Sequence, residues 1–300
     1  MQLQGIKTFS IQHRIFAYLQ LMRPANIITA WADILAGFTV TGTLTHSNFS
    51  SLGLLLLATT GLYGGGIVFN DVFDADLDAQ ERPERPIPSG RANRLGAIYL
   101  GTALLILGIG AAAQVSLSSF LLATGIALAA LLYDAWGKHR LLISPLNMGL
   151  CRGGNLLLGV SIVPELLVEQ WYIALIPVIY IAAITAMSRG EVHGGKHSTG
   201  ILALLMLSVV LGSLWWLGAK NILNTLPFWL LFAIRVVPAW IKAALTPQPE
   251  LIGKAVKAGV ISLILLDATL AASFGAIINS LLILSLLPLS LLLARRFAVT

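Results

Sequence analysis

The chain has 300 residues, of which 57% are apolar and only 11% are charged. Soluble domains contain roughly 25% charged residues, and the mean hydropathy of +0.86 is typical of an integral membrane protein. The net charge of +6 does not indicate nucleic-acid binding, because the basic residues stand in short gaps between apolar runs, where membrane topology places them. The single cysteine, Cys151, excludes an intrachain disulfide framework.

Apolar runs of about 20 residues, long enough to cross a bilayer, follow one another along the chain. They are expected near residues 24–45, 51–72, 94–114, 117–134, 145–163, 170–188, 200–219, 226–245, 254–275 and 277–295. The first 22 residues have no cleavage pattern and are expected to form an interfacial helix. With no long polar linker, residues 1–300 are predicted to form one all-α, multi-pass transmembrane domain of nine or ten helices.

The basic residues also predict an orientation. If the amino terminus is cytoplasmic, nearly all lysines and arginines between the runs lie on the inner side, and only Lys220 lies outside. Ten crossings would return Arg295 and Arg296 to the cytoplasm, whereas nine would leave them outside. Ten spans are therefore favoured.

Four aspartates and an asparagine gather where the second run ends, in the segment NDVFDADLD. Helical spacing puts Asp71, Asp74 and Asp78 on one face, with Asn70 one turn before Asp74, while Asp76 points elsewhere. Carboxylates are costly at the edge of a membrane, and a stripe of hard oxygen ligands suits Mg²⁺ shared with substrate phosphates. The alternative is a solvated acidic helix end followed by a basic loop.

The segment ERPERPIPSGR at residues 81–91 follows directly, and its arginines could bind phosphate oxygens. The pattern NDxxDxxxD followed by RPxRPxPSGR resembles the first signature of the UbiA superfamily of intramembrane prenyltransferases. The resemblance extends to RPAN at residues 23–26 and to YDAWGKHR at residues 133–140. It implies a helical bundle around a central cavity, in which two aspartate motifs bind a polyprenyl diphosphate through Mg²⁺.

The resemblance also implies roles for single residues. Metal and diphosphate binding falls to Asn70, Asp71, Asp74 and Asp78, diphosphate contacts to Asn26, Arg82, Lys138 and Arg140, and the catalytic role to Asp71, Asp74 and Lys138. Tyr133 is expected beside the substrate, where an aromatic ring could stabilise an allylic carbocation. Lining the bundle core is the alternative role for this ring.

The second signature departs from the family pattern, which has several aspartates after the sixth span. Here the segment reads SRGEVHGGKHSTG at residues 188–200, and Glu191 is its only acidic residue. Glu191 remains a candidate metal ligand and catalytic carboxylate, and a second Mg²⁺ site would lack most of its charge. Arg189, His193 and Lys196 could instead neutralise the diphosphate directly, or the segment is a basic loop that marks the cytoplasmic side.

The sequence SRGEVHGG at residues 188–195 is similar to that of a UbiA-like subgroup called EboC, found in bacterial and algal gene clusters. This resemblance would place the protein in a bacterial inner membrane. Two functions remain open. One is Mg²⁺-dependent transfer of an isoprenyl group from a polyprenyl diphosphate to an unidentified acceptor, and the other is non-catalytic isoprenoid binding linked to transport. Ion-coupled transport is less favoured, because most polar residues gather at one face.

Four charged residues stand inside apolar runs, namely Asp33, Arg152, Arg235 and Asp267. Charges at membrane depth are expected to face the bundle interior, water or one another. The aspartates are therefore predicted to pair with the arginines, and Arg152 could reach the cavity from the fifth run.

Overall fold

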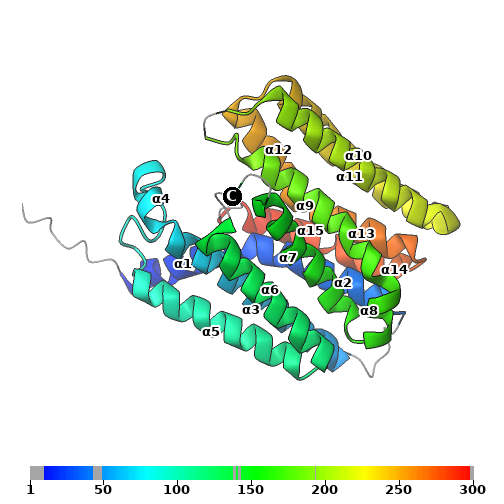
Figure 1. Cartoon of the computed structure of the whole chain (residues 1–300), viewed down its shortest axis with the longest axis horizontal. Helices are drawn as coiled ribbons and strands as arrows, with labels where there is room; N and C mark the ends of the chain where they lie inside the picture. The colour runs from blue at the N-terminus through cyan, green and yellow to red at the C-terminus, as the bar shows by residue number, and fades with distance from the viewer. Residues whose placement is uncertain (1–9, 43–48, 138–139, 141–142, 193, 298–300) are drawn as a thin grey trace, which may run out of the picture.

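The computed structural model describes residues 10–42, 49–137, 140, 143–192 and 194–297, and these ranges form helices without a β-strand (Figure 1). The amino-terminal half contains α1 (Ile11–Met22), α2 (Pro24–Val40), α3 (Phe49–Phe73), α4 (Ala75–Glu81), α5 (Arg94–Ala113), α6 (Leu117–Ala135) and α7 (Ile143–Val160). The second half contains α8 (Pro164–Gln170), α9 (Leu175–Ser188), α10 (His197–Gly218), α11 (Ile222–Leu245), α12 (Pro249–Ile261), α13 (Leu263–Ser273), α14 (Ile277–Leu284) and α15 (Leu286–Leu293). The predicted all-α fold is confirmed.

Each apolar run predicted from the sequence overlaps at least one of these helices. Among the described residues, six helical stretches are long and apolar enough to cross a membrane: Phe49–Phe73, Arg94–Ala113, Leu117–Ala135, Pro164–Ser188, His197–Leu245 and Pro249–Ser273. The fifth stretch is 49 residues long and folds back on itself as α10 and α11, which run side by side along one edge of the molecule (Figure 1). The number of crossings, nine or ten, stays a prediction.

A left-handed backbone at Arg23 separates α1 from α2. Its φ of 47° is the one positive φ of a non-glycine residue in the described part of the chain, and such a conformation is uncommon for a residue with a Cβ atom. Pro24 then begins α2, because the fixed φ of proline suits the first helical position. The turn brings Arg23 to the carboxyl end of α3, where its guanidinium donates to Asp71.

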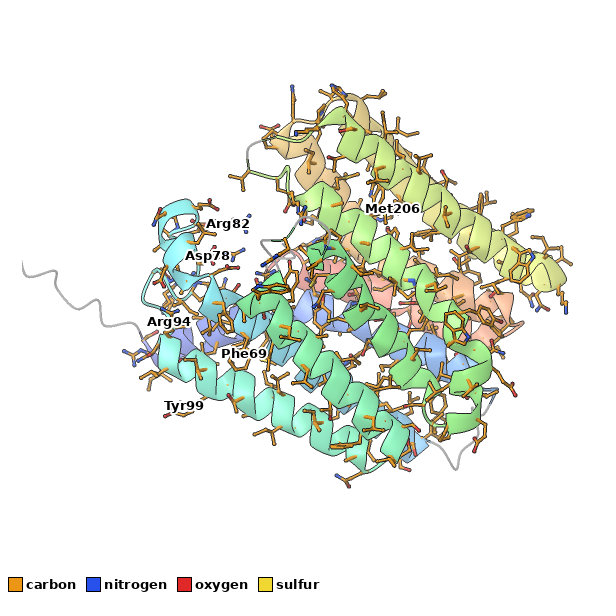
Figure 2. All side chains as sticks on the ribbon, viewed as in Figure 1. Phe69, Asp78, Arg82, Arg94, Tyr99 and Met206 are labelled. Atoms are coloured by element: carbon orange, nitrogen blue, oxygen red, sulfur yellow. The ribbon has the colours of Figure 1, made fainter. Side chains whose placement is uncertain are left out.

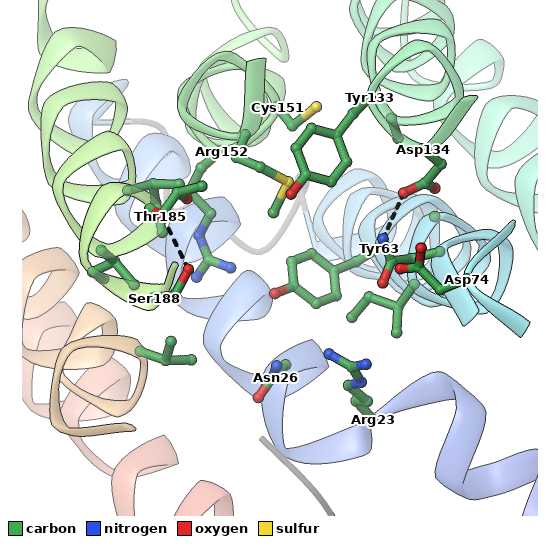
Figure 3. Close-up of a pocket in the computed structure, with 18 of the residues that line it drawn as sticks. Arg23, Asn26, Tyr63, Asp74, Tyr133, Asp134, Cys151, Arg152, Thr185 and Ser188 are labelled. Atoms are coloured by element: carbon green, nitrogen blue, oxygen red, sulfur yellow. Dashed lines mark hydrogen bonds between the residues drawn. The ribbon is translucent and has the colours of Figure 1, made fainter. Parts of the chain in front are cut away.

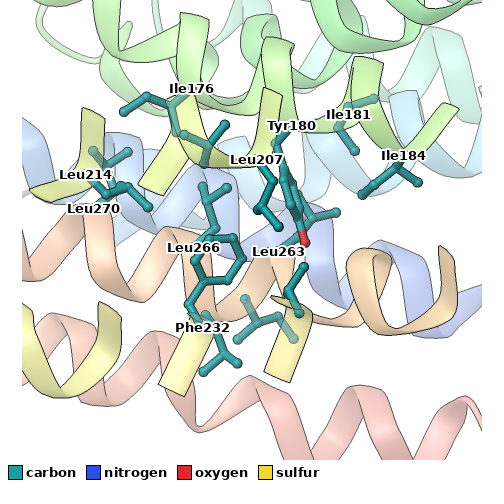
Figure 4. Packing of buried hydrophobic residues seen from close by; sticks show 14 of the residues in the cluster. Ile176, Tyr180, Ile181, Ile184, Leu207, Leu214, Phe232, Leu263, Leu266 and Leu270 are labelled. Atoms are coloured by element: carbon teal, nitrogen blue, oxygen red, sulfur yellow. The ribbon is translucent and has the colours of Figure 1, made fainter. Parts of the chain in front are cut away.

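The core of the second half forms around α13, whose eleven residues are all buried. Next to it, the Tyr180 ring stacks on Trp240 with ring centroids 5.7 Å apart and meets Phe232 edge-on at 5.4 Å. The Tyr180 hydroxyl donates to the Gly259 carbonyl at 3.0 Å. Figure 4 shows Tyr180 and Phe232 among the aliphatic side chains of α9, α10 and α13. These contacts hold α9 against α11 and α12.

Of the two arginines inside apolar runs, one forms the predicted ion pair with an aspartate and the other does not. Arg152 forms an ion pair with Asp33, with Nε and Oδ2 2.6 Å apart. Arg235 is exposed on α11 and forms no ion pair with the buried Asp33 or Asp267, so the predicted pairing of this arginine with an aspartate is wrong. The reason is the phase of the helix, because Phe232, Val236 and Trp240, at spacings of four residues, form its buried face.

Small residues set the distance between α3 and α5. A Cβ atom on Gly61 would lie 2.3 Å from the Leu104 carbonyl oxygen and 2.8 Å from the Gly108 amide nitrogen. The two backbones can therefore approach closely only while residue 61 is glycine. Gly65, one turn later, is similarly placed against Leu105.

We expect Gly61→Ala to destabilise the protein by about 1–3 kcal/mol, because the helices must separate to admit the methyl group. Gly53→Ala on the same helix is the matched control, since a Cβ there meets nothing within 4 Å, and alanine favours a helix over glycine. Thermal unfolding of the detergent-solubilised protein measures both. Equal melting temperatures for the two variants would contradict this account of the α3–α5 contact.

Candidate active site

A cavity of about 440 Å³ opens between the two halves of the bundle. Its mouth is polar and lies at the ends of α2, α3 and α9, with α4 beside it. The mouth is lined by Arg23, Asn26, Asn70, Asp74, Asp78, Glu81, Arg82, Arg85, Asp134, Ser188 and Glu191. The interior is mostly apolar, with Ile67, Ile126, Ala130, Ile181, Ile184, Val256, Val260 and Leu263 in its wall. Figure 3 shows residues from both parts.

The predicted acidic helix face is interrupted at Asp74. Helix α3 ends at Phe73 and α4 begins at Ala75. Helical hydrogen bonds continue across the bend, because the Asp74 amide donates to the Asn70 carbonyl at 3.0 Å and the Asp78 amide to the Asp74 carbonyl at 2.8 Å. Asn70, Asp74 and Asp78 consequently face the same cavity, whereas Asp71, which the spacing predicts on the same face, does not line it, and Asp76 is exposed. Figure 2 shows α4 projecting at this end, with Asp78 and Arg82 labelled.

Two arginines neutralise this face. Asp71 accepts from Arg23 at 3.0 Å and from Arg85 at 3.3 Å, and the same Arg85 nitrogen donates to Asp78 at 2.7 Å. Asp71 is only 5% exposed and is not part of the cavity lining. Sequence reasoning assigned phosphate contacts to the arginines of residues 81–91 and gave Arg23 no role, and it did not predict that Arg23 and Arg85 pair with the aspartates. Their signal was present, since both arginines stand in the quoted RPAN and RPxRP segments.

The residues in the last turn of α6 and in the segment after it contribute unequally to the cavity. Tyr133 lines the cavity, as predicted, together with Asp134, which sequence reasoning did not assign. Asp134 is 3% exposed and accepts from the Asn70 side-chain amide at 2.8 Å, which fixes the orientation of that amide. Arg140 is exposed and stacks over the Trp136 ring at 4.2 Å. The predicted contact Lys138 lies outside the described residues.

The segment after α9 presents one carboxylate to the cavity and its cations to the outside. Glu191 lines the mouth, whereas Arg189 and Lys196 are exposed and are not in the lining. Arg189 donates to the Arg140 carbonyl at 2.9 Å, which joins the loop after α6 to the end of α9. His193 lies outside the described residues. In this arrangement Glu191 stands near Arg23 and Arg82 instead of beside the cations of its own segment.

The acidic face supplies the donors that a hard divalent cation prefers. Among the described residues, no group of three or more histidine, cysteine or acidic side chains is arranged to hold a metal ion. Asn70, Asp74 and Asp78 nevertheless share one cavity wall and offer only oxygen ligands beside the Asn70 nitrogen. Arg85 occupies the carboxylates of Asp71 and Asp78, so a cation and Arg85 would compete for the same oxygens.

The comparison with known proteins identifies relatives. A sequence model described as the UbiA prenyltransferase family matches residues 27–250. Digeranylgeranylglyceryl phosphate synthase from Methanothrix thermoacetophila is 43% identical over 90 residues, which cover 30% of this chain and 33% of that protein. The chain thus spans about a third of the length of such curated relatives.

Solved structures share the fold. A UbiA homolog from Aeropyrum pernix K1 superposes with a TM-score of 0.64 at 16% identity, over 87% of this chain and 98% of that one. A UbiA homolog from Archaeoglobus fulgidus bound to DMAPP and Mg²⁺ gives a TM-score of 0.55 at 20% identity, again over 87% and 98%. These three relatives are archaeal, so a bacterial membrane stays a prediction.

We expect Arg85→Met to lower the free energy of unfolding by about 1.5–3 kcal/mol, because it leaves charged acceptors without their donor. Arg94→Met is the matched control. Its ion pair with Asp76 has side chains 48% and 87% exposed, against 15% and 7% for Arg85 with Asp78, and such surface pairs contribute little. Chemical unfolding in detergent measures both variants. A loss from Arg94→Met as large as that from Arg85→Met would contradict the assignment.

Burial raises the pKa of the Glu191 carboxyl, and the positive charges of Arg23 and Arg82 oppose this shift. As pH rises above the unfolded value of 4.5, the unfolded chain releases this proton first, so wild-type stability falls until the folded pKa is passed. We therefore expect the stability of Glu191→Gln relative to wild type to rise across this window and then level off. Melting temperatures from acidic to neutral pH test this, and a difference that does not vary with pH would refute it.

Proposed function

This chain belongs to the UbiA prenyltransferase family, and on that premise we propose that it is an integral membrane prenyltransferase. Its substrate is a polyprenyl diphosphate, whose isoprenyl group it transfers to an acceptor. The single observation that carries this proposal is the division of one cavity into a charged mouth and an apolar interior. A diphosphate attached to a hydrocarbon chain has the same division.

The mouth suits the leaving group of such a reaction. Transfer breaks the bond between C1 of the prenyl group and the diphosphate oxygen, and the electron pair leaves with the diphosphate. Arg23, Arg82 and Arg85 line the mouth, and guanidinium groups bind phosphate oxygens through paired hydrogen bonds. Fixed cations at these oxygens stabilise the negative charge as it develops. The acceptor then bonds to C1, and the proton it loses passes to diphosphate or water.

The acidic face would hold Mg²⁺ through Asn70, Asp71, Asp74 and Asp78, and the ion would neutralise diphosphate charge. The structure of the Archaeoglobus fulgidus homologue holds DMAPP and Mg²⁺, which supports the same pairing here. In the arrangement described, Arg85 holds Asp71 and Asp78. Release of these carboxylates would free Arg85 to bind the diphosphate.

The second signature would supply one acidic ligand, Glu191, and a set of cations. Arg189 and Lys196 are exposed beside the mouth, and together with Lys138, Arg140 and His193 they would reach the diphosphate from the loops that follow α6 and α9. Asn26 and Tyr133 line the cavity and would contact the diphosphate and the first isoprene unit. These loops are proposed to lie on the cytoplasmic side, as the distribution of basic residues predicts.

A non-catalytic isoprenoid-binding protein is the second candidate function. The observation that favours it is the poverty of carboxylates after α9, where Glu191 is the only acidic side chain between Ser188 and Gly200. Binding without transfer would leave the diphosphate bond intact. The two functions therefore differ in a measurable product.

We expect the purified protein to bind farnesyl diphosphate only with Mg²⁺, and we expect Asp74→Ala to weaken this binding at least tenfold, because it removes a hard ligand from the mouth. Asp76→Ala is the control, since Asp76 is exposed and pairs only with Arg94 among the described interactions. Isothermal titration with and without EDTA measures both variants. Equal affinity of wild type and Asp74→Ala would remove the metal assignment.

Transfer itself is tested with radiolabelled farnesyl diphosphate and a lipid extract of membranes that contain the protein. A prenyltransferase yields a labelled, extractable lipid and one equivalent of inorganic diphosphate. Diphosphate binding with neither product would support the non-catalytic function instead.

A further inference from the structure

The inner part of the cavity contains a polar cluster that a prenyl chain does not require. Thr59, Tyr63, Arg152 and Asn155 line the cavity together with the apolar side chains. Tyr63 precedes Asp71 by two turns of α3 and Thr59 by three, so the cluster begins about 12 Å from the acidic face at the helical rise per residue. A prenyl chain has no hydrogen-bonding group at that depth. A hydrogen-bond donor at that depth therefore indicates a ligand with a polar group other than the diphosphate.

Arg152 is the centre of this cluster. Its Nε pairs with Asp33 at 2.6 Å, one terminal nitrogen, Nη2, donates to the Thr29 carbonyl, and the guanidinium lies 5.6 Å from the centroid of the Tyr63 ring. The residue is 3% exposed. The remaining nitrogen, Nη1, is buried and has no hydrogen-bond partner among the described residues. An unpaired buried donor is costly and calls for an explanation.

The side chains around Arg152 hold it rigidly. Asn155 donates to Asp33 at 2.8 Å and to the Ala30 carbonyl at 2.9 Å, while its own oxygen accepts from Thr59 at 2.7 Å. Glycines allow this network, because a Cβ on Gly37 would collide with the backbone of α7. The guanidinium is therefore positioned by its contacts with Asp33 and the Thr29 carbonyl, which leave Nη1 without a partner among the described residues.

The charges of the cluster select the kind of ligand. Asp33 neutralises Arg152 directly, and Asp267, fully buried on α13, interacts electrostatically with both of them. Asp33 already neutralises Arg152, so a carboxylate or phosphate brought to Nη1 would add an unbalanced negative charge in a medium where charge is costly. A hydroxyl or carbonyl oxygen can accept from Nη1 without adding charge.

We propose that Arg152, held by Asp33 and Asn155, binds a neutral oxygen of the acceptor, a hydroxyl or a carbonyl, at the inner end of the cavity. The identification of this ligand as the acceptor rests on the proposed function. The site itself is a property of the apolar cavity and is independent of the diphosphate mouth. It predicts that the acceptor is a lipid-soluble alcohol, phenol or ketone that places an uncharged oxygen in this part of the cavity.

The experiment compares three probes of one size, namely 1-naphthol, naphthalene and 1-naphthoate, with affinities corrected for partition into protein-free micelles. Wild type should bind 1-naphthol about tenfold more tightly than naphthalene, as expected for a hydrogen bond from a charged donor, and more tightly than 1-naphthoate. The double variant Arg152→Met with Asp33→Leu removes both charges of the pair. In it the advantage of 1-naphthol over naphthalene should fall below about threefold.

Arg235→Met, which removes an exposed arginine of α11, should retain the preference for 1-naphthol. Mg²⁺-dependent binding of geranyl thiodiphosphate is measured on the same samples, and it should persist in the double variant. If wild type does not bind geranyl thiodiphosphate, the proposed function is wrong. The affinities for the three naphthalene probes then still test the inner site independently.

The order of the three probe affinities in wild type tests the proposal even if the double variant does not fold. Tighter binding of 1-naphthoate than of 1-naphthol would overturn the proposal in favour of an anion site. Equal binding of 1-naphthol and naphthalene would overturn it as well, as would an unchanged preference in a folded double variant.

Discussion

The cost of burying charge in an apolar bundle governs the arrangement of this protein. A carboxylate at the edge of a membrane segment must be paired or solvated, and Asp71 is paired twice, with Arg23 and Arg85. Deeper in the bundle, Asp33 is paired with Arg152. Arg23 directly precedes α2 and pairs with Asp71 of α3, whereas Asp33 and Arg152 lie on α2 and α7. The pairs therefore fix how α2 sits against α3 and α7, and the cavity lies between those helices.

Interruptions in the helices bring the charges to the mouth. The left-handed turn at Arg23 aims its side chain at α3, and the bend at Asp74 lets α4 turn over the end of the cavity. A left-handed backbone at a non-glycine residue, as at Arg23, is typical of functional sites. Arg85 then bridges the two sides of the bend through Asp71 and Asp78. The same carboxylates would serve a cation, so Arg85 and the cation would compete for Asp71 and Asp78.

Hydropathy and helical spacing predicted the membrane class, the positions of the helices and the acidic face, because these depend on residues that are neighbours in sequence. The partners of that face depend on tertiary structure. Arg23 lies 48 positions from Asp71, and Asp134 lies 64 from Asn70, so no local pattern reveals these contacts. Arg235 was predicted to pair with an aspartate, and this prediction was wrong. The buried face of α11 is occupied by Phe232, Val236 and Trp240, so Arg235 lies on another face of the helix.

The central claim is that one cavity holds the diphosphate at its mouth and the prenyl chain in its interior, and photolabelling tests it most directly. A farnesyl diphosphate analogue with a diazirine on its last isoprene unit would be bound with Mg²⁺, irradiated and mapped by mass spectrometry. The account predicts labels on interior residues such as Ile126, Ile181 and Val256, and unlabelled farnesyl diphosphate should suppress them. Labels confined to the exposed face of α11, at Leu231 and Ile234, and insensitive to competitor would contradict it.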